Sequence, residues 1–395
     1  MQNNKFSIGA HFALCVFFTV LIGTGHALAQ SAAEMYLDRK NKSNENTISI
    51  MAAGITGTYA PIAQDIQSVV DETDKVDGMR VLPILGRGGG ANVMDILFLR
   101  GVDMGITQQE HLEYFKRQNP VLYGDIYQRV HYITKLYNSE YHILVPKSIT
   151  HFSQLQGKKV NFYKEESSTA IANITIFDIL GIKVEPTHVE LKDSIDKLRT
   201  GELAAATYIG GVPVSGFTSG IKPEDNLHFL ALSPETLPPG GYEKLLKVFL
   251  PTTLPREAYP VLIPEGDRVM TVASGAVLAV YNWPEQSDRY RRVANFVQGF
   301  FDKFDKFLEP SRHPKWKEIN LAGTVPQWNR FKAAQEWLDQ HKVSGASAAS
   351  DPMKVAFEQF LTRQPSGAKE LSPQQRDKLF QDFIGWWQTR GTAPR

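Results

Sequence analysis

The sequence predicts an α/β protein, because short apolar strands alternate with helical patterns and each strand ends at a turn of small residues. The first strand is expected over residues 48–53, followed by the turn 54–61 and a helix with apolar residues at helical spacing. A second strand, 80–85, leads into the glycine-rich turn 86–92 and a second helix, and a third strand is expected at 102–107. This order favours a mainly parallel sheet with helices on its faces.

The two glycine-rich turns are the main candidates for a ligand site. Each turn precedes a helix, whose first N–H groups are unpaired and whose N-terminus carries a positive partial charge, so the two together suit a carboxylate or a phosphate. Small residues let a ligand approach the backbone closely. The alternative is that these turns serve only the geometry of strand-to-helix connections.

The second turn also fits the dinucleotide-binding pattern G-x-G-x-x-A at residues 86–91, with Asp103 near the expected distance of the acidic ribose ligand. This fingerprint normally belongs to the first strand–helix unit. Here it follows the second strand and contains an extra glycine and Arg87. A nucleotide is therefore not expected, and no other cofactor is predicted.

The chain is expected to cross into a second lobe near the extended run 137–145 and to return through the apolar run 269–281. Between these crossings, a strand is predicted at 160–163 and a helix at 168–180, with Gly181 ending the helix. The same kind of unit then repeats. Because ligands of open α/β sheets lie beyond the carboxyl ends of the strands, the small-residue turns of both lobes are expected to meet at one cleft.

The repeated unit consists of a short helix at 193–200, a strand at 204–209 and the small-residue turn 210–213. After the return crossing, one long amphipathic helix is expected from Asp288 to Leu308. Its aromatic stripe is interpreted as core packing.

Three blocks of the chain, taken in their order and spacing, resemble the TAXI family of periplasmic solute-binding proteins, which is associated with TRAP-type transporters. These blocks are Gly54–Ala63, Gly88–Leu97 and Gly101–Gln109, and the similarity extends over roughly Ile48 to Lys306. The resemblance implies a two-lobed, type II periplasmic-binding-protein fold that closes on a ligand in its cleft. It also implies a small carboxylate ligand, a dicarboxylate or amino acid such as glutamate or 2-oxoglutarate.

The expected ligand site combines turns from both lobes. In the second turn the chain departs from the family, because glycines and an alanine stand where hydroxyl residues are usual. Backbone N–H groups, hydroxyls and amides from the first lobe are expected to hold the ligand carboxylate, and the second lobe is expected to close over it. The predicted ligand-binding residues are Thr56, Gly57, Thr58, Tyr59, Arg87, Gly89, Gly90, Gln108, Gln109, Glu166, Ser167, Ser168, Thr169, Gly210, Gly211 and Pro213.

The N-terminus has the pattern of a secretory signal peptide over residues 1–29. Lys5 precedes an apolar stretch at 12–22, which is shorter than the about 20 residues of a membrane span, and Ala27-Leu-Ala29 fits the A-x-A cleavage pattern. The single cysteine, Cys15, lies within this apolar stretch. A periplasmic protein cleaved near Ala29 is therefore expected, and it would contain no disulfide or catalytic thiol.

The remaining chain divides into lobes and appendages. Residues 30–47 are expected to form a flexible leader, 48–139 with 270–343 the first lobe, 140–269 the second lobe, and 344–395 a linker and helical extension. The extension carries an aromatic stripe, which is interpreted as docking on the protein's own body. A partner-binding or self-association helix is the alternative.

The composition excludes some functions. With 43 Lys and Arg against 42 Asp and Glu, the net charge of +1 argues against nucleic acid or an anionic membrane as the main partner. The sequence has no H-E-x-x-H metal motif, G-x-S-x-G elbow or Walker A loop, so neither an enzyme nor a metal site is predicted.

The predicted function is a solute receptor that delivers a small organic anion to membrane subunits of a TRAP-type transporter. The alternative is a sensor or protein-interaction module that kept the fold.

Overall fold

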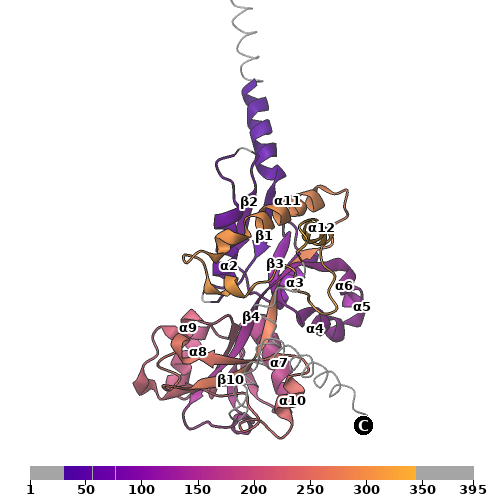
Figure 1. Cartoon of the computed structure of the whole chain (residues 1–395). Coiled ribbons are helices and arrows are strands. Elements are labelled where there is room, and N and C mark those ends of the chain that lie inside the picture. The colour runs from indigo at the N-terminus through magenta and orange to yellow at the C-terminus, as the bar shows by residue number, and fades with distance from the viewer. Residues whose placement is uncertain (1–30, 56, 76, 344–395) are drawn as a thin grey trace, which may run out of the picture.

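A computed structural model describes residues 31–55, 57–75 and 77–343, and it confirms the predicted α/β fold (Figure 1). The chain forms two lobes joined at a narrow waist. One ten-stranded sheet runs through both lobes in the order β2-β1-β3-β10-β4-β7-β5-β6, with β8 beside β4 and β9 beside β10.

The first lobe is built around three parallel strands. These are β1 (Thr47–Met51), β2 (Arg80–Ile84) and β3 (Met104–Gln108), with β1 between the other two. Helices α2 (Tyr59–Val70) and α3 (Gly90–Phe98) follow β1 and β2 as the apolar spacing predicts. The lobe also contains α4 (His111–Gln118), α5 (Pro120–Tyr123), α6 (Ile126–Arg129), α11 (Asp288–Asp302), η4 (Phe304–Leu308), η5 (Pro314–Glu318) and α12 (Lys332–Gln340).

The second lobe also contains three parallel strands, of which β5 and β6 are shorter than those of the first lobe. Strands β5 (Lys159–Asn161), β6 (Glu185–Thr187) and β7 (Ala205–Gly210) are parallel, and β5 lies between the other two. The main helices are α7 (Ser168–Leu180) and α8 (Leu191–Arg199). Smaller elements are η1 (Phe152–Leu155), α9 (Ser215–Thr218), η2 (Pro223–Asp225), β8 (Leu227–Phe229), α10 (Gly241–Leu245), β9 (Leu250–Pro255) and η3 (Arg256–Ala258).

Two long strands, β4 (Val130–Pro146) and β10 (Arg268–Tyr281), cross between the lobes. They pair antiparallel from Tyr281 opposite Val130 to Ala273 opposite Glu140. Each lobe therefore combines a parallel set of strands with these antiparallel crossing strands. The crossing strands make the sheet continuous through both lobes. The first crossing strand begins earlier than the run 137–145 in which the sequence indicated it.

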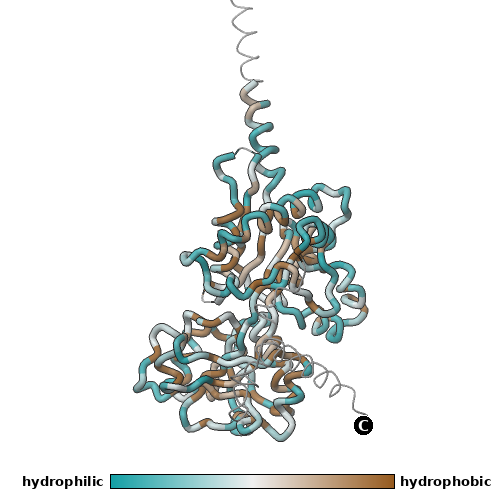
Figure 2. Tube along the Cα trace, in the orientation of Figure 1, coloured by the Kyte–Doolittle hydropathy of each residue, from teal (hydrophilic) through white to brown (hydrophobic). Residues whose placement is uncertain are grey.

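Each lobe has its own hydrophobic core. On β4 the first-lobe core includes Tyr137 and the second-lobe core includes Tyr141, while on β10 the corresponding residues are Ala276 and Val272. The cores therefore separate where the two strands pass through the waist. Figure 2 shows the same arrangement, with the apolar segments gathered inside each lobe.

Two local expectations differ from the structure. The polar segment 30–47, expected as a flexible leader, is helical over residues 31–45 and exposed, and Thr47 already belongs to β1. Its Ala, Glu, Leu, Arg and Lys residues are strong helix formers, and Asp38 pairs with Lys42 one turn on.

The long helix expected over 288–308 ends at Asp302 and continues as the tighter turn η4. That turn places Phe307 against Trp316, with ring centroids 4.2 Å apart.

The predicted signal peptide and the predicted helical extension lie outside the described residues. Within residues 31–343, apart from positions 56 and 76, no helix is both long and apolar enough to span a membrane.

Candidate ligand-binding site

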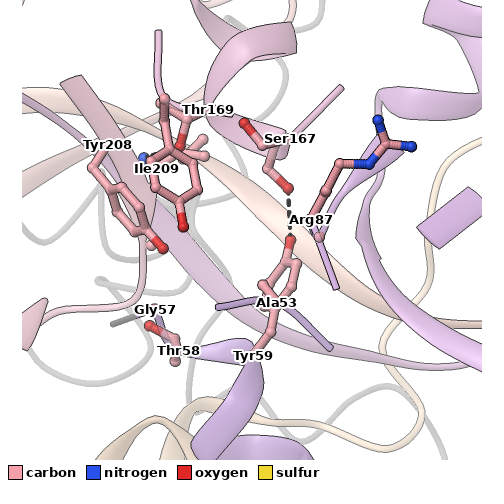
Figure 3. A pocket seen from close by; sticks show the side chains of 13 residues that line it. Ala53, Gly57, Thr58, Tyr59, Arg87, Ser167, Thr169, Tyr208 and Ile209 are labelled. Atoms are coloured by element: carbon pink, nitrogen blue, oxygen red, sulfur yellow. Dashed lines mark hydrogen bonds between the residues drawn. The ribbon is translucent and has the colours of Figure 1, made fainter. Parts of the chain in front are cut away.

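A small cavity, partly open to solvent, lies where the two lobes face each other. Figure 3 shows side chains from both lobes around it. The lining residues are Ala53, Gly57, Thr58, Tyr59, Arg87, Gly88, Tyr163, Ser167, Ser168, Thr169, Tyr208, Ile209 and Gly210.

The N-termini of two helices, one from each lobe, line this cavity. Helix α2 begins at Tyr59 after the cap residue Thr58, and helix α7 begins at Ser168 after Ser167. The Ser167 hydroxyl accepts a hydrogen bond from Ala170 N at 3.1 Å, which leaves the earlier N–H groups of α7 without a partner inside the helix. Neither helix carries an acidic residue in its first turn. Both ends therefore present positive partial charge toward the cavity.

The sequence had indicated α2 and α3 as the two converging helix ends, but α3 begins against the second lobe. Its second residue, Ala91, donates its N–H to the Glu166 carbonyl at 3.1 Å. A Cβ at Gly89 would lie 2.3 Å from Ser168 N, and one at Gly90 would lie 2.8 Å from Glu166 O. The two glycines thus permit close contact between the lobes.

Polar contacts between the lobes surround the cavity. Thr58 Oγ1 donates to Gly211 O at 3.1 Å and accepts from Gly211 N at 2.9 Å. The Tyr59 and Ser168 hydroxyls share a hydrogen bond of 3.0 Å, drawn as the dashed line in Figure 3. These bonds hold the lobes in a closed arrangement.

Arg87 is the cationic side chain among the lining residues. Its guanidinium lies 2.9 Å from the Glu166 carboxylate, and both side chains are about half exposed. In Figure 3 the Arg87 side chain is directed away from Tyr208 and Gly57. Arg87 therefore lies at the rim of the cavity, where Glu166 offsets part of its charge.

Gln108 and Gln109, which were predicted to bind the ligand, lie deeper in the waist. They are not among the residues that line the cavity in the described part of the chain. Gln108 is fully buried at the end of β3. The backbone of Gln109 pairs with Gly275 O and accepts from the Trp328 indole N–H. Behind them, Glu110 bonds the Ser274 hydroxyl, and burial raises the pKa of Glu110 to about 7.

The structure brings half of the predicted site residues to one cavity. Those that line it are Gly57, Thr58, Tyr59, Arg87, Ser167, Ser168, Thr169 and Gly210. The residues that line the cavity in the described part of the chain do not include Gly89, Gly90, Gln108, Gln109, Glu166, Gly211 and Pro213. Thr56 lies outside the described residues. The omitted residues are near the cavity in sequence, but their backbone or side chains serve contacts between and within the lobes.

Two aromatic residues of the lining were missing from the predicted set. Tyr163 follows β5, and Tyr208 lies in β7 two residues before its end. Their rings meet edge to face with centroids 5.2 Å apart. The signal that identifies them is their position at the carboxyl ends of neighbouring parallel strands. Ala53 and Gly88 complete the part of the lining that was not predicted, and Ile209 begins the second-lobe turn that was expected to close over the ligand.

Crossing strands, two lobes and a cavity between them define the architecture of a periplasmic binding protein. The chain belongs to the NMT1-like family, whose model matches residues 50–324. A comparison with curated protein sequences found no match.

Solved structures with a similar fold include binding proteins from different organisms. A periplasmic sulfonate-binding protein from Methylobacillus flagellatus is 12% identical, with 86% of this chain and 94% of that chain covered and a TM-score of 0.38. A Candida albicans protein with the generic periplasmic-binding-protein fold is 12% identical, with coverages of 74% and 80% and a TM-score of 0.42. A structure described as a periplasmic transporter is 9% identical, with coverages of 75% and 98% and a TM-score of 0.43. At these identities the likeness concerns the fold alone.

Proposed function

We propose that this protein is a periplasmic solute-binding protein that captures a small organic anion between its lobes. The observation that carries the proposal is the convergence of the α2 and α7 N-termini on one cavity. Two positive helix ends and their free N–H groups favour a carboxylate or a similar anion. The resemblance of the sequence to the TAXI family favours a ligand such as glutamate or 2-oxoglutarate.

The side chains around the cavity support a polar ligand held by neutral donors. Ser167, Ser168 and Thr169 bring hydroxyls from the second lobe, and Tyr59 brings a phenol from the first. Burial raises the pKa of Tyr59, so its hydroxyl stays neutral and able to donate at physiological pH. Arg87 at the rim supplies a cation that an entering carboxylate meets beside Glu166.

The connection between the lobes supports a clamshell motion. Two strands, β4 and β10, pass through the waist, and their pairing has register irregularities between Gly275 and Val277 and between Leu278 and Ala279. A hinge at this point would separate the Thr58–Gly211 and Tyr59–Ser168 contacts and open the cavity to solvent.

A ligand screen by thermal shift and calorimetry tests the proposal. Glutamate, 2-oxoglutarate and succinate are compared with glutaramide, a neutral compound of similar size. A ligand at about 100 times its dissociation constant stabilises the folded state by roughly 2.7 kcal/mol. We expect an anion of this size to raise the unfolding temperature, and the neutral diamide to leave it unchanged.

Two variants sharpen the screen. Arg87→Gln removes the rim cation, and Arg100→Gln removes an exposed arginine outside the lining and serves as the matched control. Weaker anion binding is expected only for Arg87→Gln. Equal stabilisation by the diamide, or no stabilisation by any of the three carboxylates, would contradict an anion receptor and favour a sensor or interaction module.

We also propose that the protein belongs to the TAXI branch and delivers its ligand to the membrane subunits of a TRAP-type transporter. The support is the resemblance of the three sequence blocks, which fall inside the residues that match the NMT1-like family. Ligand uptake by membrane vesicles that contain those subunits, measured with and without the protein, is the test. Uptake that does not depend on the protein would contradict coupling to transport.

A further inference from the structure

A buried ion pair lies behind the cavity, at the waist. Lys315 in η5 places its Nζ 2.6 Å from Glu140 Oε1 and 2.7 Å from Glu318 Oε1. Lys315 is 4% exposed and Glu140 is 6% exposed. Burial acts to lower the pKa of Lys315, but the two carboxylates outweigh it and hold the pKa above its ordinary value, so the ammonium is charged.

Glu140 lies in the part of β4 that pairs with the second lobe, opposite Gly210 of β7, so its contact with Lys315 joins the two lobes. Its Oε2 accepts a hydrogen bond from Val212 N at 3.0 Å. Val212 follows Gly211, whose backbone bonds Thr58, and Gly210, which lines the cavity. One carboxylate therefore connects a lysine of the first lobe to the second-lobe turn that borders the ligand.

The turn packs directly on this lysine. A Cβ at Gly211 would lie 3.0 Å from Lys315 Cγ and 3.0 Å from Tyr137 Cε2, so the absence of a side chain lets the turn settle on both. On the other side, Lys315 is fixed to the first-lobe core through its neighbour Trp316, which packs on Phe307.

Rotation of the lobes about the waist would move Lys315 relative to Glu140. A buried charge is strongly disfavoured unless it is paired and hydrogen-bonded, so in the closed arrangement seen here Lys315 and Glu140 each depend on the other. Lys315, Glu140 and Val212 are not among the residues that line the cavity in the described part of the chain.

We propose that Glu140 and Lys315 form a latch that stabilises the closed lobes and positions the 210–212 turn for the ligand. They are positioning residues, since they act through that turn. The inference rests on the proposed ligand role of the cavity, but the latch itself is measurable without any ligand.

Distances between spin labels on the two lobes test the latch. Gln64 on α2 and Lys192 on α8 are exposed, and residues 31–343 contain no cysteine, so Gln64→Cys and Lys192→Cys give specific labels. Pulsed electron paramagnetic resonance then reports the interlobe distance in the unliganded protein. We expect Glu140→Gln and Lys315→Met to increase the population with long distances at least fivefold, and Lys315→Arg to resemble the parent.

The matched control is Asp225→Asn, which breaks the Arg199–Asp225 pair of 2.8 Å within the second lobe. It should change stability without changing the distances. Unaltered distances in folded Glu140→Gln would overturn the latch. If that variant does not fold, Lys315→Met, which leaves Glu140 without its cation, is assessed by the same criterion.

Adding glutamate or 2-oxoglutarate to the labelled parent separates this proposal from the proposed function. Distances that never respond to ligand would count against a clamshell receptor. The latch would still stand or fall on the unliganded variants.

Discussion

Replacing Thr58 with valine should weaken ligand binding by destabilising the closed lobes. Thr58 is 4% exposed, and its hydroxyl both donates to and accepts from the backbone of Gly211. Valine has nearly the same shape but no hydroxyl. In the closed state of the variant, the Gly211 N–H and C=O lose this partner, whereas in an open state water hydrates them.

The magnitude follows from the cost of an unsatisfied buried group. Such a group costs about 1–3 kcal/mol, which corresponds to a shift of about 5- to 150-fold in the equilibrium between closed and open lobes. Because the ligand binds the closed lobes, its apparent dissociation constant should rise by about the same factor when closure is unfavourable.

Calorimetry with the anion identified by the screen measures this change, and small-angle scattering measures the compactness of the ligand-free variant. Thr58→Ser keeps the hydroxyl and should bind within about twofold of the parent. Ser68→Ala removes an exposed hydroxyl from the same helix and controls for changes in α2 itself. If Thr58→Val binds as tightly as the parent, the Thr58–Gly211 contact does not contribute to closure and the reasoning fails.

Three other changes are predicted. Gly89→Ala should prevent full closure, because its Cβ would lie 2.3 Å from Ser168 N; scattering with saturating ligand should show an open shape, and normal closure would contradict the contact. The free energy of unfolding of Glu110→Gln should rise relative to that of the parent as pH increases from 5 to 8. Burial raises the pKa of Glu110 in the folded state to about 7, so the parent loses stability as pH rises above 4.5. The difference should grow by on the order of 2–3 kcal/mol in urea unfolding, and a pH-independent difference would refute it. A chain ending at Lys342 should bind its ligand normally, because the residues that line the cavity in the described part of the chain all precede Lys342. If a folded truncation no longer binds the ligand in calorimetry, the extension belongs to the site.

Local signals in the sequence were sufficient where one helix is determined by its own ends. Helix α7 has the predicted bounds because Ser167 caps its first turn and Gly181 adopts a left-handed conformation with φ of 67° at its end. Strands β1, β2, β3, β5 and β7 were likewise found from short apolar runs, with boundaries shifted by one or two residues. Strands β6, β8 and β9 were not predicted, and β4 begins before the run in which it was expected. The end of α11 was missed because the packing of Phe307 on Trp316 is tertiary and leaves no periodic signal.

The ligand site was only partly predictable for a similar reason. The sequence marks turns of small residues at strand ends, but it does not say which turn faces the cavity and which faces the other lobe. Gly89 and Gly90 have the same local pattern as Gly57, yet they contact the second lobe while Gly57 lines the cavity. Tyr163 and Tyr208 were missed because large aromatic residues at strand ends are as common in cores as in sites.

The two helix ends that face the cavity also link ligand charge to closure. The N-termini of α2 and α7 each carry about half a positive charge, so closing the lobes brings like charges together. Glu166 offsets part of the charge of Arg87, but it lies at the rim and leaves the helix ends uncompensated. A carboxylate between them replaces this repulsion with two attractions, whereas a neutral ligand of the same size does not. The preference for a carboxylate over its amide should therefore exceed the about 1.5–3 kcal/mol of a single charged hydrogen bond, and a smaller preference would mean that closure does not depend on these dipoles.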